Sequence, residues 1–101
     1  MPIFRTKKEA FIWLSSGEKT IDVRKGKPRH GEIANVLCGR KVLQLRILSK
    51  ETGLLTEVIN QNNFRLVIPS APCLNDAFAY LEKLYECRDG IFTAYYLGPL
   101  E

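Results

Sequence analysis

Three charged side chains, Lys19, Asp22 and Arg24, lie close together in the segment Gly17–Arg24, which reads GEKTIDVR. Apolar and polar residues alternate from position 20 to 24, as in a strand, so Asp22 and Arg24 share one face. The planar guanidinium suits a phosphate or a base edge, and the carboxylate can accept from an amino group or orient the guanidinium. The pattern predicts a polar pocket. The alternative is an ion pair that only closes one end of the fold.

Positive charge is concentrated around this segment. The chain has 15 lysines and arginines against 11 acids, a net charge of +4. Residues 19–41 hold seven of these bases and only two acids, so this quarter carries +5 and the rest −1. The seven are Lys19, Arg24, Lys25, Lys27, Arg29, Arg40 and Lys41. Local concentration of this kind is typical of a surface that binds a polyanion. An acidic protein partner is the other interpretation.

Length and composition narrow the class of protein. A chain of 101 residues is expected to form one domain, residues 1–101, and no apolar run is long enough to span a membrane. The N-terminus has no apolar segment like that of a signal peptide, which predicts a cytoplasmic protein. Three cysteines without a CxxC pair, and a single histidine, His30, predict reduced thiols, no metal site and no cofactor.

Periodicity and turn residues predict an α+β order. A first helix is expected between Thr6, as N-cap with Glu9 completing a capping box, and Gly17. A second is expected over residues 74–86, capped by Asn75. Strands are predicted over residues 2–5, 19–25, 32–39, 41–50, 54–59 and 91–97, with a turn at 51–53 and a loop at 26–31. Strands this short predict a compact β-barrel of five to six strands flanked by two main helices. Trp13 is expected either to cover a barrel end or to line a cleft.

This order resembles the ASCH family of the PUA-like superfamily. The family pattern is G-x-K-x-x-E-x-R, and here Asp22 stands where glutamate is usual. The segments GEIANVL and SAPCLNDAFAYLEKLYECRDGIFTAYYL resemble the family's next strand and its final helix and strand, so the likeness covers nearly the whole chain. The resemblance implies a β-barrel with a cleft beside the motif strand. It also implies binding of RNA or of a modified nucleoside.

The family also contains enzymes. One branch hydrolyses N4-acetylcytidine with the pattern K-T-I-T-I-R, in which the lysine and the second threonine are catalytic, and some members have been described as ribonucleases. Here Asp22 replaces that threonine, and Thr20 occupies the other, non-catalytic threonine position. If the protein is an enzyme, its candidate residues are Lys19, Thr20 and Asp22, with Glu57 as the only stand-in for the branch's later glutamate.

The sequence therefore favours an RNA-binding module over a small hydrolase acting on RNA or a modified nucleoside. The predicted RNA contacts are Lys19, Asp22 and Arg24 in the cleft, with a basic rim around them. The rim comprises Lys25, Lys27, Arg29, Arg40 and Lys41.

Overall fold

The computed structural model describes residues 2–86 and 89–100. Its elements follow in chain order as β1 (Ile3–Arg5), α1 (Lys8–Ser16), β2 (Ile21–Lys25), β3 (Ile33–Cys38), β4 (Lys41–Gly53), α2 (Leu55–Val58), α3 (Phe64–Val67), α4 (Leu74–Tyr85) and β5 (Phe92–Gly98). None of the helices in this part of the chain has the length and apolar character needed to cross a membrane.

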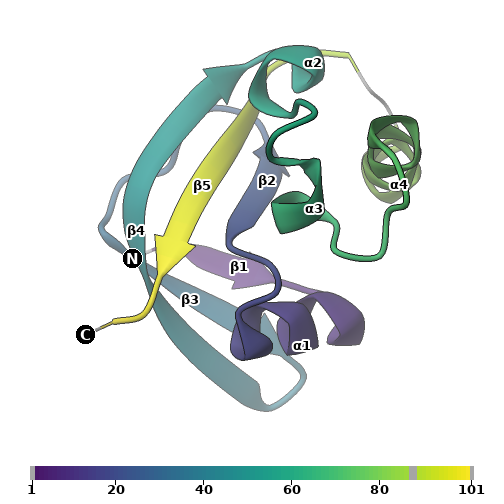
Figure 1. Ribbon diagram of the computed structural model, residues 1–101. Coiled ribbons are helices and arrows are strands. Elements are labelled where there is room, and N and C mark those ends of the chain that lie inside the picture. The colour runs from purple at the N-terminus through teal and green to yellow at the C-terminus, as the bar shows by residue number, and fades with distance from the viewer. Residues whose placement is uncertain (1, 87–88, 101) are drawn as a thin grey trace.

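The strands form one sheet in the order β1-β3-β4-β5-β2, curled into a half-barrel (Figure 1). β1 runs parallel to β3, with Ile3 opposite Asn35, and the other pairs are antiparallel. The long strand β4 pairs with β3 and then with β5, and its register shifts between Ile47 and Ser49. Such a bulge strengthens the local bend and helps the sheet to curl. The predicted α+β barrel-like fold with two main helices, α1 and α4, is confirmed.

Two apolar clusters fill the molecule. One lies inside the curled sheet and consists of Phe4, Leu14, Ala34, Val36, Ile47, Tyr95 and Leu97. The other lies between the sheet and helices α2–α4 and includes Ile21, Val23, Leu55, Val58, Phe64, Val67, Phe78, Leu81 and Phe92. Strand β2 therefore has packed side chains on both faces, and Asp22 and Arg24 lie on the face shared with Phe4 and Tyr95.

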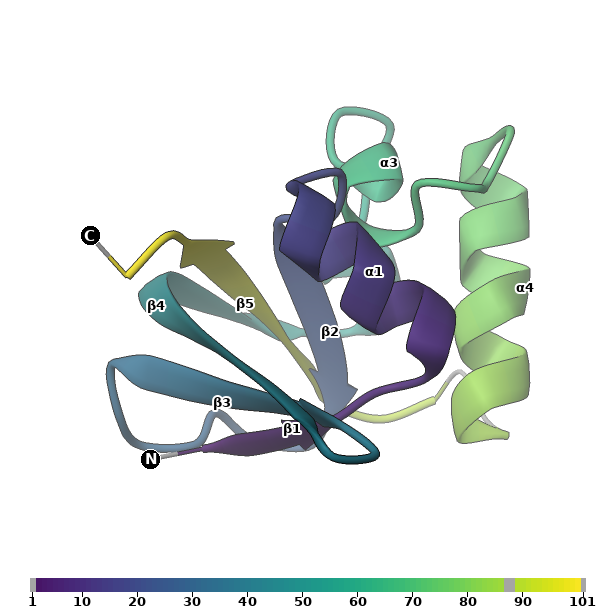
Figure 2. The same ribbon diagram turned by 90° about the horizontal axis from the view of Figure 1, so that it is seen from below.

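Helices α1 and α4 lie on the same side of β2, and side chains bridge them (Figure 2). The rings of Trp13 and Tyr80 are 6.3 Å apart, and the Tyr80 hydroxyl donates to Glu9 Oε1 at 2.6 Å. At the other end of α4 the Tyr85 hydroxyl donates to the Val23 carbonyl of β2 at 2.7 Å. These contacts connect α1 to α4 and α4 to β2, so the three elements are held around a common hollow.

The predicted turn at 51–53 and strand at 54–59 were wrong. Residues 51–53 continue β4, because β5 supplies their partners, and the Thr52 and Thr93 hydroxyls are 3.1 Å apart. Leu55 and Val58, three residues apart, are both buried, a spacing that suits the helical turn α2.

Both predicted N-caps were also wrong. The Thr6 hydroxyl donates to the Leu37 carbonyl at 3.3 Å, which leaves Lys7 as the N-cap of α1, and Cys73 is the N-cap of α4 in place of Asn75. Gly17 does end α1 in the left-handed conformation, with φ of 86°.

Candidate functional site

The turn after α1 sets the position of Lys19. Gly17 reverses the chain, the Lys19 amide donates to the Trp13 carbonyl, and the Thr20 amide donates to the Leu66 carbonyl of α3. β2 begins at the next residue. The side chain of Lys19 therefore points into the interior of the protein, between α1, β2 and α3.

Lys19 is a buried cation with acceptors around its ammonium. Its exposed fraction is 5%, and Nζ donates to the Ile21 carbonyl at 2.8 Å and to the Val67 carbonyl. Nζ also lies 3.8 Å from Asp22 Oδ1. Burial lowers the Lys19 pKa from 10.5 to about 8, although Asp22 opposes this shift and Arg24 adds to it.

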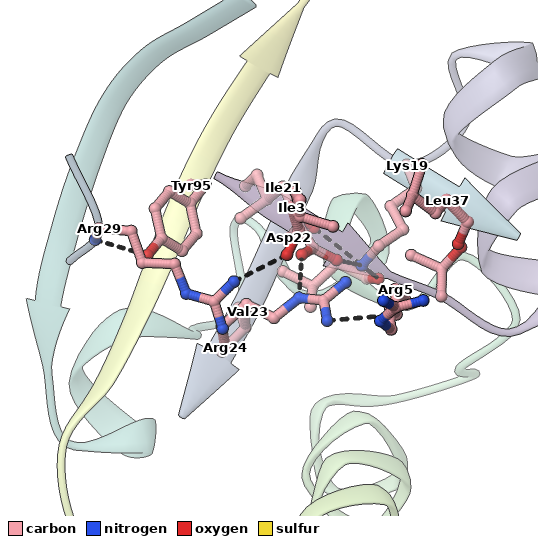
Figure 3. Close-up of polar contacts among 12 residues, drawn as sticks. Ile3, Arg5, Lys19, Ile21, Asp22, Val23, Arg24, Arg29, Leu37 and Tyr95 are labelled. Atoms are coloured by element: carbon pink, nitrogen blue, oxygen red, sulfur yellow. Dashed lines mark hydrogen bonds and ion pairs between the residues drawn. The ribbon is translucent and has the colours of Figure 1, made fainter. Parts of the chain in front are cut away.

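Asp22 and Arg24 form a short ion pair, with Arg24 Nε 2.6 Å from Asp22 Oδ2 (Figure 3). Arg24 Nη1 donates to the Arg5 carbonyl at 2.9 Å, and the guanidinium carbon lies 4.8 Å from the centre of the Phe4 ring. Arg24 thus joins β2 to β1, the two outermost strands of the sheet. The ion pair closes an end of the half-barrel and also faces a cleft.

This cleft has a volume of about 310 Å³. Its polar floor consists of Lys19, Asp22 and Arg24. Its walls come from the β1–α1 junction, α1 and α4, and include Arg5, Lys7, Ala10, Trp13, Tyr80 and Tyr85. The structure therefore brings the three motif residues together at one cleft, and it places Trp13 in the wall of that cleft.

Both tyrosines of the wall are held in their neutral form. Burial raises the pKa of Tyr85 to about 12. Burial and the adjacent Glu9 carboxylate also raise the pKa of Tyr80. These rings offer apolar faces and fixed hydroxyls to a ligand.

The structure places the residues of the predicted basic rim in separate parts of the fold. Lys25 ends β2, Lys27 is exposed in the loop that follows, and neither lines the cleft. Arg40 and Lys41 are exposed at the turn between β3 and β4. Leu37 pairs with Arg5, so this turn lies near the end of β1, outside the cleft.

Arg29 has a structural role that the sequence did not indicate. Its guanidinium donates to the Ile3 carbonyl at 2.8 Å and lies 5.5 Å from the centre of the Phe4 ring. Its amide donates to the Tyr95 hydroxyl at 3.0 Å, and its carbonyl accepts from Lys50. Arg29 therefore anchors the loop after β2 to β1 and β5, and its predicted contact with RNA stays a prediction.

The other candidate catalytic residues, Thr20 and Glu57, do not line the cleft with Lys19 and Asp22. Thr20 lines a second hollow with Leu43 and Leu97, and Lys19 also contributes to the lining of this hollow. The Glu57 carboxylate accepts from the Leu54 amide at 2.7 Å and does not line the cleft. No group of three histidine, cysteine or acidic side chains among residues 2–86 and 89–100 is placed to hold a metal ion. Cys87 lies outside the described residues.

Four charged or aromatic residues of the cleft were not predicted as site residues from the sequence: Arg5, Lys7, Tyr80 and Tyr85. Tyr85 lies in the predicted second helix, and its helical spacing alone does not separate a core residue from a cleft residue. The spacing of Tyr80 in the sequence does not indicate that it lines a cleft, because its position there depends on how α4 packs against α1. The charges of Arg5 and Lys7 were visible, but their closeness to Arg24 depends on the approach of β1 to β2.

Comparison with known proteins supports the fold alone. No family model matches the chain, and no curated protein matches it in sequence. A solved structure titled "Crystal structure of hypothetical protein PH0355" matches with a TM-score of 0.77 over 97% of each chain. The sequence identity is 13%, so the likeness concerns the arrangement of the elements.

Proposed function

We propose that this protein is a cytoplasmic RNA-binding module of the ASCH type, and that its cleft holds one nucleotide of a single-stranded segment. The observation that carries the proposal is the lining of the cleft, where four cations meet one carboxylate beside three aromatic rings. Cations attract the backbone of a nucleic acid, and aromatic faces stack on unpaired bases.

The size of the cleft supports one nucleotide. Its volume of about 310 Å³ is at the lower end of the range for small-ligand pockets, roughly 300–1,000 Å³. A polymer must therefore run over the surface and insert one unstacked unit. The exposed Lys27, Arg40 and Lys41 are available for phosphates on either side.

One observation favours the alternative, a hydrolase acting on RNA or a modified nucleoside. The lowered pKa of Lys19 is what a lysine acting as a general base requires. Against it, the Lys19 ammonium is directed at two carbonyls and Asp22, and Thr20 does not line the cleft. An uncharged Lys19 would have to leave these acceptors before it could take a proton from a substrate.

The test is binding of a single-stranded RNA measured by fluorescence anisotropy between about 50 and 200 mM salt. Each phosphate contact contributes about −0.7 to the logarithmic salt slope. The double change Lys27→Gln and Lys41→Gln should flatten the slope by about 1.4. The matched control Lys8→Gln and Lys83→Gln removes the same charge outside residues 19–41 and should leave the slope unchanged.

Two outcomes would contradict the proposal. One is the absence of RNA binding at low salt. The other is equal flattening by both double variants, which would mean that binding follows net charge and not this surface.

A further inference from the structure

The cleft extends along one face of α1. Lys7, Ala10 and Trp13 are spaced by three residues, so they share the helix face that lines the cleft. With a rise of about 1.5 Å per residue, Lys7 and Trp13 stand roughly 9 Å apart along the axis. The small Ala10 between them leaves room for a ligand that spans this length.

One end of the cleft is cationic. Arg24 Nη1 donates to the Arg5 carbonyl, which places the guanidinium at the β1–α1 junction beside Arg5 and Lys7. Nε is occupied by Asp22, and within residues 2–86 and 89–100 Nη2 has no hydrogen-bond partner. Among the described residues that line the cleft, Asp22 is the only carboxylate, and it is already paired with Arg24. The excess charge at this end is therefore positive.

The other end is aromatic. The Trp13 and Tyr80 rings lie 6.3 Å apart at an angle of 49°, one from each helix. Lys7 Nζ lies 5.7 Å from the centre of the Tyr80 ring, so Tyr80 extends from the aromatic end toward the cationic end. A flat apolar group and an anion can therefore be accommodated in one cleft.

We propose that the minimal ligand of the cleft is a nucleotide and not a nucleoside, with its phosphate at Arg5, Lys7 and Arg24 and its base against Trp13 and Tyr80. The inference rests on the proposed function for the choice of a nucleic-acid component. A neutral nucleoside would leave the cationic end uncompensated, whereas a phosphate accepts charge-assisted hydrogen bonds from it. Inorganic phosphate alone would leave the aromatic end empty.

The test compares four probes by isothermal titration at low salt: uridine, uridine 5′-monophosphate, uridine 3′-monophosphate and inorganic phosphate. One of the two monophosphates should bind at least about tenfold more tightly than uridine and than phosphate, the effect of one or two charge-assisted hydrogen bonds. The other three bases are tested in the same way, so that a base preference cannot hide the effect.

The variant is Lys7→Gln, because Arg24 joins two strands and its removal would disturb the fold. Lys7 is exposed, and the neighbouring Lys8 is exposed but does not line the cleft, so Lys8→Gln is the matched control. Lys7→Gln should reduce the preference for monophosphate over nucleoside by about threefold to tenfold, and Lys8→Gln should leave it unchanged.

The inference is overturned if nucleosides bind as well as their monophosphates, if phosphate alone binds as well, or if the two lysine variants behave alike. RNA binding measured in parallel separates the two proposals. If RNA binds while the nucleotides show no preference over nucleosides, the inference fails and the proposed function stands. If monophosphates are preferred but RNA does not bind, the proposed function fails and the inference stands.

Discussion

Raising the pH from 7 to 9.5 should stabilise this protein, because Lys19 is buried as a cation. Its pKa is about 8 in the folded protein, and about 10.5 is expected once the side chain is solvated in the unfolded chain. Below pH 8 the lysine is protonated in both states, and the cost of burying the charge is fully present. Between pH 8 and 10.5 the unfolded chain binds more protons, so the free energy of unfolding rises with pH.

The magnitude follows from the difference in pKa. Each unit corresponds to about 1.4 kcal/mol, so the full relief is about 3 kcal/mol, of which about 2 kcal/mol is gained between pH 7 and 9.5. The pH range of this prediction ends at 9.5 because the pKa values of Tyr80 and Tyr85 are raised in the folded state. Ionisation of tyrosines in the unfolded chain destabilises the protein above about pH 10.

The assay is urea denaturation at both pH values of the wild type and of Lys19→Met, under reducing conditions. Lys19→Met keeps most of the apolar volume and loses the titrating group, so other groups that titrate in this window cancel in the comparison. Direct titration of Lys19 Nζ by NMR in the wild type gives the folded-state pKa independently. An equal change in stability for both proteins, together with a Lys19 pKa near 10.5, would refute the reasoning.

Three further changes test the packing around the site by urea denaturation. Asp22→Asn should cost about 3–5 kcal/mol, because it breaks a buried pair with Arg24; a loss below about 1 kcal/mol would show that the pair is screened by solvent. Gly17→Ala should cost about 1–2 kcal/mol from backbone strain alone, since a Cβ at this site meets nothing within 4 Å; no loss would show that the turn relaxes. Tyr85→Phe should cost about 1 kcal/mol by removing the hydrogen bond to Val23; an unchanged stability would mean that water replaces it.

The motif was predictable because local rules place its residues. Alternation in a strand puts Asp22 and Arg24 on one face, and a glycine in the left-handed conformation ends the preceding helix next to Lys19. These rules need only neighbouring residues, and the structure agrees with them.

The rest of the cleft depends on contacts between distant segments. Tyr80 reaches the site because α4 packs against α1, and its partner Glu9 lies 71 positions earlier in the chain. The same holds for β4, whose last residues look like a turn until β5 provides hydrogen-bond partners. Arg29 resembles a free surface charge in the sequence, and only the approach of β1 and Tyr95 shows that it is anchored.

The arginines that join β1 to the loop and strand opposite it also affect how separate molecules meet. β1 and β2 are the two edges of the sheet, and an unprotected edge can pair with a strand of another molecule and start aggregation. Here the carbonyls of Ile3 and Arg5 accept from Arg29 and Arg24. An incoming strand would have to displace two guanidinium groups and then face their charge. The same two side chains that close the half-barrel therefore also protect its first strand from intermolecular pairing.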